Sequence, residues 1–105
     1  MLLKNKTSVV TGCNRGIGKK ILEEFSKNGS DIFACVRSLD ENFKKITKEL
    51  EAKYKNKIYP IQIDLSDEES VKNGGKNILS NNVNIDILIN NAGSIDTSIF
   101  QMTSI

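Results

Sequence analysis

The sequence predicts an α/β fold in which a parallel sheet is covered by helices on both faces. Short apolar runs alternate with longer segments whose apolar residues recur every three or four positions, the pattern of strand–helix–strand units. The run Ile32 to Val36 is apolar at every position, as expected for a strand buried on both faces. A cluster of glycines separates the first apolar run from the first helical pattern.

We expect four strands and three helices. The expected strands are about 7–11, 31–37, 58–64 and 85–90, and the expected helices are about 17–28, 40–55 and 66–81. Ile17, Ile21, Leu22 and Phe25 fall on one face of the first helix, which predicts that this face packs on the sheet. Asn28-Gly29 is typical of a helix end with a left-handed residue.

Local signals also predict features of the third strand and the third helix. Pro60 cannot donate to a sheet ladder, so strand 58–64 is expected at an edge. Ser66 is predicted to cap the third helix, with Glu69 completing a capping box. Gly74-Gly75 weaken that helix and suggest close packing on the sheet.

A glycine-rich loop joins the first expected strand to the first expected helix. Gly12, Gly16 and Gly18 lie in the run T-G-C-N-R-G-I-G at 11–18. Glycine permits a tight turn and lets the backbone approach a pyrophosphate without an intervening Cβ. The following helix directs free N–H groups and its positive dipole end toward such an anion. We therefore expect a Rossmann-type doubly wound sheet, truncated to strand order 3-2-1-4, with strand 3 at the edge.

The loop spacing is G-x-x-x-G-x-G, not the G-x-G-x-x-G of many dinucleotide-binding loops. With Thr11 before it and Ile17 within it, the loop resembles the T-G-x-x-x-G-I-G loop of the short-chain dehydrogenase/reductase family. Residues 90–93, Asn-Asn-Ala-Gly, are similar to a second motif of that family. Within the family, the Asn-Arg-Gly-Ile-Gly run looks most like 3-oxoacyl-(acyl-carrier-protein) reductases.

The resemblance implies a set of contacts to a nicotinamide dinucleotide. The glycine loop would surround the phosphates, Asp64 would contact the adenine amino group, and Asn91 would line the nicotinamide-ribose side, while Asn90 would tie the sheet together. The alternatives are a purely structural turn for the loop and a helix-leading turn aspartate for Asp64. The expected cofactor-binding residues are Thr11, Gly12, Asn14, Arg15, Gly16, Ile17, Gly18, Arg37, Asp64, Leu65, Asn91, Ala92 and Gly93.

Two arginines indicate which cofactor is preferred. An NAD-preferring site carries an acidic residue near the end of the second strand, whereas an arginine there accommodates a 2′-phosphate. Here Arg37 ends the strand, and no acidic residue follows before Asp40. Arg15 lies where many NADP-dependent family members hold a second basic residue. We expect NADP(H) in preference to NAD(H), against the alternative that Arg37 is only a solvated strand end.

The family's catalytic Tyr-x-x-x-Lys motif does not occur in this sequence. Tyr54 is followed four residues later by Ile58, and Tyr59 by Ile63. We therefore expect residues 1–105 to form an N-terminal cofactor-binding half-domain that is inactive alone and holds no catalytic residue. A full-length form would be an oxidoreductase acting on a carbonyl or 3-oxoacyl substrate, and, like most of the family, a homo-oligomer.

Composition argues against several other classes. Fifteen basic and 13 acidic residues give a net charge of +2, which provides no reason to expect nucleic acid or an anionic membrane. No stretch approaches the ~20 apolar residues of a membrane span, and the first residues lack a secretory apolar run, so we expect a cytoplasmic protein. Histidine is absent, and Cys13 and Cys35 form no C-x-x-C, so we expect both cysteines to be small, soft fillers rather than a metal site or a nucleophile.

Two alternative functions remain at the level of sequence. The chain could be a non-catalytic module that senses a nucleotide or pairs with a partner through the open edge of its fourth strand. It could also be a structural α/β domain with an incidental glycine loop, which would bind neither nicotinamide cofactor.

Overall fold

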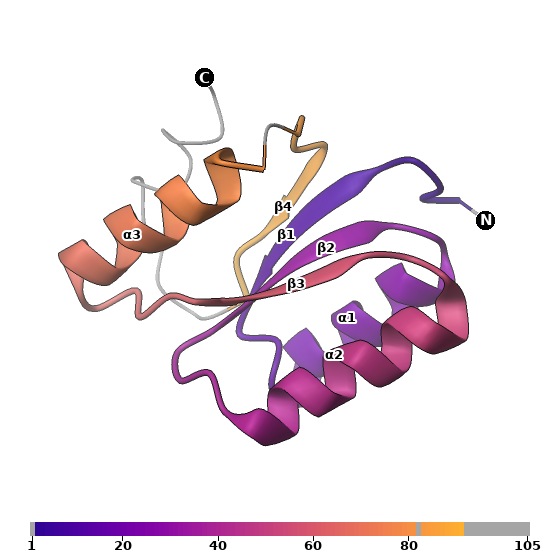
Figure 1. Ribbon diagram of the computed structural model, residues 1–105, viewed down its shortest axis with the longest axis horizontal. Helices are drawn as coiled ribbons and strands as arrows, with labels where there is room; N and C mark the ends of the chain where they lie inside the picture. Colours follow the sequence, from indigo (N-terminus) through magenta and orange to yellow (C-terminus); the bar gives the residue numbers. More distant parts are fainter. Residues whose placement is uncertain (1, 82, 92–105) are drawn as a thin grey trace.

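The computed structural model, which describes residues 2–81 and 83–91, is a four-stranded parallel sheet with helices on both faces (Figure 1). The elements are β1 (Thr7–Thr11), α1 (Gly16–Lys27), β2 (Asp31–Val36), α2 (Glu41–Tyr54), β3 (Ile58–Gln62), α3 (Glu68–Leu79) and β4 (Ile87–Ile89). The strand order is β3-β2-β1-β4, and every pairing is parallel. The predicted fold class and strand order are confirmed.

Two hydrophobic clusters fill the layers on either side of the sheet. α1 and α2 lie on one face and α3 lies on the other (Figure 1). The cluster under α1 and α2 contains Ile32, Ala34 and Val36, and the cluster under α3 contains Phe33 and Cys35. Successive side chains of a strand point to opposite faces, so β2 contributes to both clusters in turn. This explains why its sequence is apolar at every position.

Helix α1 follows the predicted amphipathic pattern except at its start. Leu22 is fully buried, and Ile21 and Phe25 pack partly buried against the core under α1 and α2. Ile17 is 71% exposed, so the prediction that it faces the core was wrong. The first turn of α1 lies at the carboxyl edge of the sheet, where Ile17 lines a cleft instead of packing on a strand. The helix ends as expected, because Gly29 has a φ of +92°.

The observed strand limits leave several polar residues in loops. β2 ends at Val36, so Arg37 begins the connection to α2. β3 ends at Gln62, so Asp64 lies beyond the strand. Helix α2 begins at Glu41 because the Asp40 carboxylate caps it, accepting a hydrogen bond from the N–H of Phe43 at 2.8 Å.

The predicted capping box of α3 was wrong by one residue. Asp67 is the N-cap, and its Oδ1 accepts from the N–H groups of Glu69 at 3.0 Å and Ser70 at 3.5 Å. The Ser66 hydroxyl donates instead to Oδ1 of Asp64 at 2.6 Å. Ser66 thus satisfies a charged acceptor in the connection after β3, while the adjacent Asp67 supplies the cap.

The structure explains why a proline is tolerated in β3 and why a glycine occurs in the middle of α3. β3 is an edge strand, so the missing N–H of Pro60 need not break a ladder with a further strand. A Cβ added at Gly74 would lie 2.3 Å from Cγ1 of Ile63, so glycine allows α3 to approach the sheet closely. The prediction of close packing at this glycine is confirmed.

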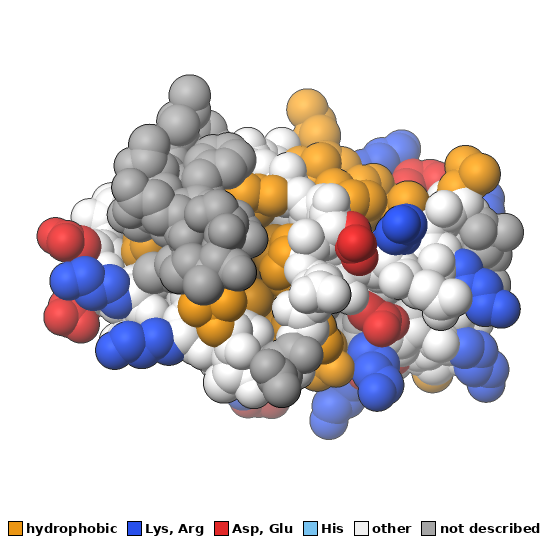
Figure 2. Space-filling model, turned by 90° about the horizontal axis from the view of Figure 1, so that it is seen from above, with side chains coloured by type: hydrophobic (Ala, Val, Ile, Leu, Met, Phe, Trp, Pro, Cys, Tyr) orange, Lys and Arg blue, Asp and Glu red, His pale blue; other side chains and the backbone are white. Residues whose placement is uncertain are grey.

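The outer side of β4 has no strand partner within residues 2–81 and 83–91. All three residues of β4 are only partly buried, and Leu79 and Val83 nearby in sequence are exposed. Figure 2 shows the molecule from above the view of Figure 1, and hydrophobic side chains lie at the surface on this side of the molecule. Within the same described ranges, no helix combines the length and apolar character that a membrane crossing requires.

Candidate functional site

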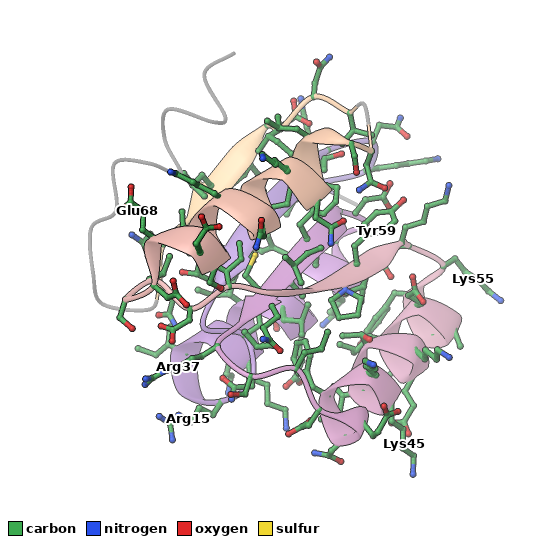
Figure 3. All side chains as sticks on the ribbon, turned by 60° about the vertical axis from the view of Figure 1, so that its left-hand side comes forward. Arg15, Arg37, Lys45, Lys55, Tyr59 and Glu68 are labelled. Atoms are coloured by element: carbon green, nitrogen blue, oxygen red, sulfur yellow. The ribbon has the colours of Figure 1, made fainter. Side chains whose placement is uncertain are left out.

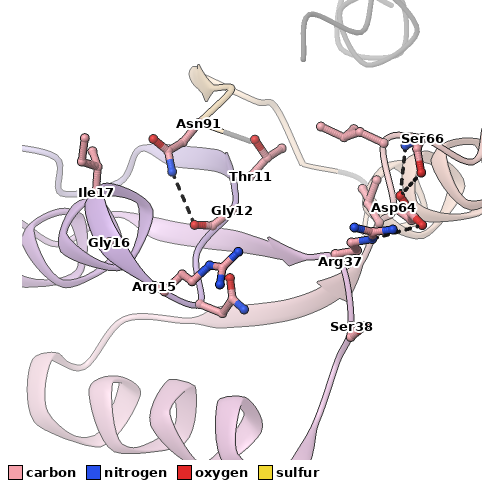
Figure 4. A pocket seen from close by; sticks show the side chains of 13 residues that line it. Thr11, Gly12, Arg15, Gly16, Ile17, Arg37, Ser38, Asp64, Ser66 and Asn91 are labelled. Carbon is pink, nitrogen blue, oxygen red and sulfur yellow. Dashed lines mark hydrogen bonds and ion pairs between the residues drawn. The ribbon is translucent and has the colours of Figure 1, made fainter. Parts of the chain in front are cut away.

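A cleft of about 790 Å³ opens at the carboxyl edge of the sheet (Figure 4). It is lined by residues that follow each of the four strands, because the carboxyl ends of parallel strands share one edge. β1 lies between β2 and β4, so the connections diverge here, which is where open α/β sheets bind ligands. The predicted residues that line the cleft are Thr11, Gly12, Asn14, Arg15, Gly16, Ile17, Arg37, Asp64, Leu65 and Asn91.

The remaining predicted residues have other positions. Gly18 lies behind the loop, against Gly12 and Asn91. Ala92 and Gly93 lie outside the described residues. Three residues that sequence reasoning did not assign to the site, Ser38, Ile63 and Ser66, also line the cleft.

The N-terminus of α1 is directed to this cleft without a side-chain cap. Its N-cap, Arg15, makes no side-chain capping hydrogen bond, and the first turn contains no acidic residue. By contrast, α2 and α3 are capped by Asp40 and Asp67. The first N–H groups of a helix have no partner within the helix, so α1 can offer them to an anion.

Two glycines shape the loop in different ways. Gly16 has a φ of +59°, and no atom lies within 4 Å of the position that a Cβ would take, so a side chain there would project into open space beside the helix N-terminus. A Cβ at Gly18 would lie 1.8 Å from the Gly12 carbonyl oxygen and 2.6 Å from Nδ2 of Asn91. Gly16 therefore keeps the approach to the N–H groups open, and Gly18 allows the loop to pack on α1.

Hydrogen bonds join the segment after β4 to the last residue of β1 and to the loop that follows it. The Thr11 hydroxyl donates to Oδ1 of Asn90 at 3.0 Å. Nδ2 of Asn91 donates to the carbonyl oxygen of Gly12 at 3.5 Å (Figure 4). Asn90 thus makes the sheet-tying contact that the sequence suggested, and Asn91 supports the glycine loop from its other side.

Two arginines border the cleft from different connections. Arg15 comes from the β1–α1 loop and Arg37 from the β2–α2 loop, and both lie at the same end of the molecule (Figure 3). The Arg37 side chain is 79% exposed, and its Nε lies 3.5 Å from Oδ2 of Asp64. The cleft therefore combines an uncapped helix N-terminus with two cationic side chains, an arrangement suited to phosphate groups.

Asp64 is held in place by the start of the β3–α3 connection. Its Oδ1 accepts from the Ser66 N–H at 3.0 Å and from the Ser66 hydroxyl at 2.6 Å. Its own N–H donates to Oγ of Ser70 at 2.8 Å. The hydrogen bonds from Ser66, and then the nearby Arg37 guanidinium, lower the pKa of the Asp64 carboxyl, so it is ionised at neutral pH.

The two cysteines and Tyr59 pack in or against the hydrophobic clusters and do not line the cleft. Cys13 is fully buried, its thiol donates to the Val10 carbonyl oxygen at 3.1 Å, and desolvation raises its pKa to about 12. Burial likewise raises the pKa of Cys35. Both cysteines are buried within the hydrophobic clusters. Tyr59 stacks on Phe33 with ring centroids 4.8 Å apart, away from the cleft.

Residues 6–104 match a family model described as short chain dehydrogenase. The chain belongs to the short-chain dehydrogenase/reductase family. The family predicted from the two motifs is therefore confirmed. In this chain Asn91, in the second motif, donates to the carbonyl oxygen of Gly12 in the glycine loop, so the two motifs are in contact at these residues.

Almost the whole of this chain is similar to known members of the short-chain dehydrogenase/reductase family. A 3-oxoacyl-(acyl-carrier-protein) reductase from Aquifex aeolicus is 35% identical over 103 residues, covering 98% of this chain and 41% of that protein. An NADP-dependent 3-hydroxy acid dehydrogenase from Schizosaccharomyces pombe is 34% identical over 91 residues, covering 87% and 35%. The structure of L-sorbose reductase from Gluconobacter frateurii, complexed with NADPH and L-sorbose, matches with a TM-score of 0.79 and 29% identity, covering 90% and 35%. The chain thus spans less than half the length of each of these relatives.

Proposed function

We propose that residues 1–105 are the cofactor-binding half of an NADP(H)-dependent short-chain dehydrogenase/reductase that reduces a carbonyl group, such as that of a 3-oxoacyl substrate. The observation that carries the cofactor preference is the presence of Arg15 and Arg37 at the cleft, with no acidic residue between β2 and Asp40. Two of the relatives support it, since one is named as NADP-dependent and another was solved with NADPH.

The residues of the cleft fit the parts of this cofactor. The pyrophosphate would meet the N–H groups at the start of α1, where Gly16 leaves space for it. The 2′-phosphate would lie between Arg15 and Arg37. Adenine would lie beside Asp64 and Leu65, which line the same cleft. NADPH, when bound, supplies a hydride, and this chain supplies binding and orientation.

The nicotinamide side of the site would be formed by the second motif. Asn91 lines the cleft and is positioned by its hydrogen bond to Gly12. In the proposed complex, Asn91, Ala92 and Gly93 face the nicotinamide ribose, where small side chains leave room for the cofactor. Thr11 and Asn14 complete the loop around the phosphates.

The expected preference follows from the strength of charge-assisted hydrogen bonds. Each hydrogen bond to a charged group contributes about 1.5–3 kcal/mol, so two arginines on one phosphate would favour NADPH over NADH by about 100-fold or more. Arg37 is largely exposed, so the preference should decrease as salt concentration rises.

Catalysis is assigned to a longer form of the protein. The sequence holds no Tyr-x-x-x-Lys, and neither Tyr54 nor Tyr59 lines the cleft. We propose that the 105-residue chain binds the cofactor without turnover, and that a cytoplasmic, homo-oligomeric full-length form binds the carbonyl substrate.

Isothermal titration of the chain with NADPH and with NADH tests the cofactor assignment. NADPH is expected to bind about 100-fold more tightly. Arg37→Gln should weaken NADPH binding by about tenfold and leave NADH binding nearly unchanged. Lys45→Gln, on the exposed side of α2, is the matched control and should change neither (Figure 3). Equal affinities for the two cofactors would contradict the proposal.

One observation favours a second candidate function, a non-catalytic nucleotide-binding or interaction module. Within the described ranges β4 has no partner on its outer side, and such an edge can pair with another chain. The mass of the native gene product distinguishes the two functions. A product of 11.7 kDa would favour the module, whereas a longer product containing Tyr-x-x-x-Lys would favour the enzyme.

A further inference from the structure

We propose that Gln62 is a positioning residue that holds the segment Arg37–Ser38 in place to recognise the 2′-phosphate of the nucleotide. Gln62 is the last residue of β3, and Arg37–Ser38 begins the connection from β2 to α2. The inference rests on the proposed function, and it assigns part of the cofactor preference to a residue that does not line the cleft.

The connection between β2 and α2 is anchored at three points. Before it, the Val36 carbonyl accepts from the N–H of Ile63 at 2.9 Å. After it, Asp40 caps α2. Between these, the N–H of Leu39 donates to Oε1 of Gln62 at 3.1 Å. Since Leu39 directly follows Arg37–Ser38, the Gln62 contact limits how far this segment can move from the end of β3.

Gln62 has little else to do in the fold. Its side chain is exposed, so it adds nothing to the hydrophobic clusters, and within the described residues its carboxamide makes this one hydrogen bond. Loss of the bond would leave the Leu39 N–H accessible to water, so the cost to global stability should be small. The cost would instead appear as mobility of the loop, which must be removed again when a nucleotide binds.

The ion pair of Arg37 with Asp64 cannot replace this anchor. Nε of Arg37 lies 3.5 Å from Oδ2 of Asp64, and the arginine is largely exposed. Exposed pairs of this kind contribute about 0–1 kcal/mol because water and salt screen them. Asp64 can therefore bias the direction of the guanidinium, whereas the backbone that carries Arg37 is held by the Val36 carbonyl on one side and by the Gln62–Leu39 contact on the other.

Two adenine nucleotides isolate the proposed effect. 2′,5′-ADP and 5′-AMP differ only in the 2′-phosphate, so the dissociation constant of 5′-AMP divided by that of 2′,5′-ADP reports recognition of that group. Gln62→Met removes the acceptor and keeps the length of the side chain. This variant is expected to lower the ratio about three- to tenfold through weaker 2′,5′-ADP binding, with 5′-AMP binding unchanged. Asn73→Leu, which removes an exposed amide on α3, is the control and should keep the wild-type ratio.

Hydrogen exchange of the Leu39 amide gives a second readout. Exchange should be faster in Gln62→Met and close to wild type in Gln62→Glu, which keeps an acceptor oxygen. Should Gln62→Met fold poorly, Gln62→Ser, whose side chain is too short to reach Leu39, provides the same test. An unchanged nucleotide ratio, or equal weakening of both nucleotides, would overturn the inference and leave the proposed function intact. A wild-type chain that binds both nucleotides alike, or neither, would overturn the proposed function and this inference with it.

Discussion

Gly16 and Gly18 are the first and third residues of α1. Replacing each by alanine distinguishes two properties of the glycine loop: its packing on the helix and the access that it leaves for an anion. A Cβ at Gly18 would lie 1.8 Å from the Gly12 carbonyl oxygen, where ordinary van der Waals contact begins at 3.4 Å. The obstructing atom belongs to the backbone, so a side-chain rotation cannot relieve the clash. A Cβ at Gly16 meets no atom within 4 Å, but the backbone there has a φ of +59°. Gly18→Ala should therefore disturb the fold, and Gly16→Ala should mainly obstruct the anion site.

The expected magnitudes differ between the two variants. Alanine is favoured over glycine within a helix by about 1 kcal/mol, whereas overpacking a rigid site costs about 1–3 kcal/mol or more. For Gly18→Ala we expect the clash to exceed the helix preference, with a net loss of about 2 kcal/mol. That loss corresponds to a decrease in Tm of roughly 8–16 °C for a chain of this size. Gly16→Ala should cost about 1 kcal/mol through its left-handed backbone.

Thermal unfolding followed by circular dichroism measures the stability part, and titration with NADPH below the transition measures access. Gly16→Ala should lower the affinity for NADPH by more than partial unfolding of the variant would cause. A Gly18→Ala chain as stable as wild type would refute the packing argument. Unchanged NADPH affinity in Gly16→Ala would refute the assignment of the open space beside Gly16 to a phosphate.

Three further predictions concern the core and the carboxyl edge. Gly74→Ala should destabilise the chain by about 1 kcal/mol in urea unfolding, because its Cβ meets the Ile63 side chain at a cost of about 1–3 kcal/mol, against a helix preference for alanine of about 1 kcal/mol; an unchanged midpoint would contradict this. Cys13 and Cys35 should resist thiol reagents at neutral pH until the chain unfolds, because burial raises both pKa values; rapid labelling under native conditions would show that the loop opens. The folded-state pKa of Asp64 is lowered, so its contribution to stability is present above the ordinary value of 3.8 and is lost as pH falls through the lower folded value. The stability difference between wild type and Asp64→Asn should therefore shrink with acidification, and a constant difference would argue against these interactions.

Much of the fold was predictable because its signals are local. The strand–helix alternation, the doubly buried β2 and the edge position of Pro60 each depend on a short stretch of sequence and on the general geometry of parallel sheets. The cleft at the carboxyl edge follows from the same topology, since parallel strands must end on one side. For this reason the predicted residues of the first three connections lie together around one cleft.

The errors occurred where tertiary position, and not the local pattern, decides the role of a residue. Periodicity assigned Ile17 to the buried face of α1, but the first turn of the helix lies at the edge of the sheet and not over it. Ser66 and Asp67 can both cap a helix, and the choice depended on Asp64, whose carboxylate accepts from the Ser66 hydroxyl. Helical spacing and capping preference describe one element at a time, so neither could identify these tertiary partners.

The contact of Gln62 with Leu39 left no signal in the sequence. An exposed glutamine at the end of an edge strand satisfies every local rule without a specific role. Its hydrogen-bond partner lies in the preceding strand–helix connection, which only the parallel pairing of β2 with β3 brings within reach. Positioning residues of this kind become visible only when the register of the strands is known.

Amide NMR of the isotope-labelled chain, titrated separately with NADPH and NADH, tests most directly the claim that the carboxyl edge is an NADP(H) site. The account predicts a dispersed spectrum, with shifts at residues 12–18 and at Arg37 that are larger and saturate earlier with NADPH. Equal shifts with both cofactors would contradict the role of the arginines, and a spectrum that neither cofactor changes would contradict the site itself.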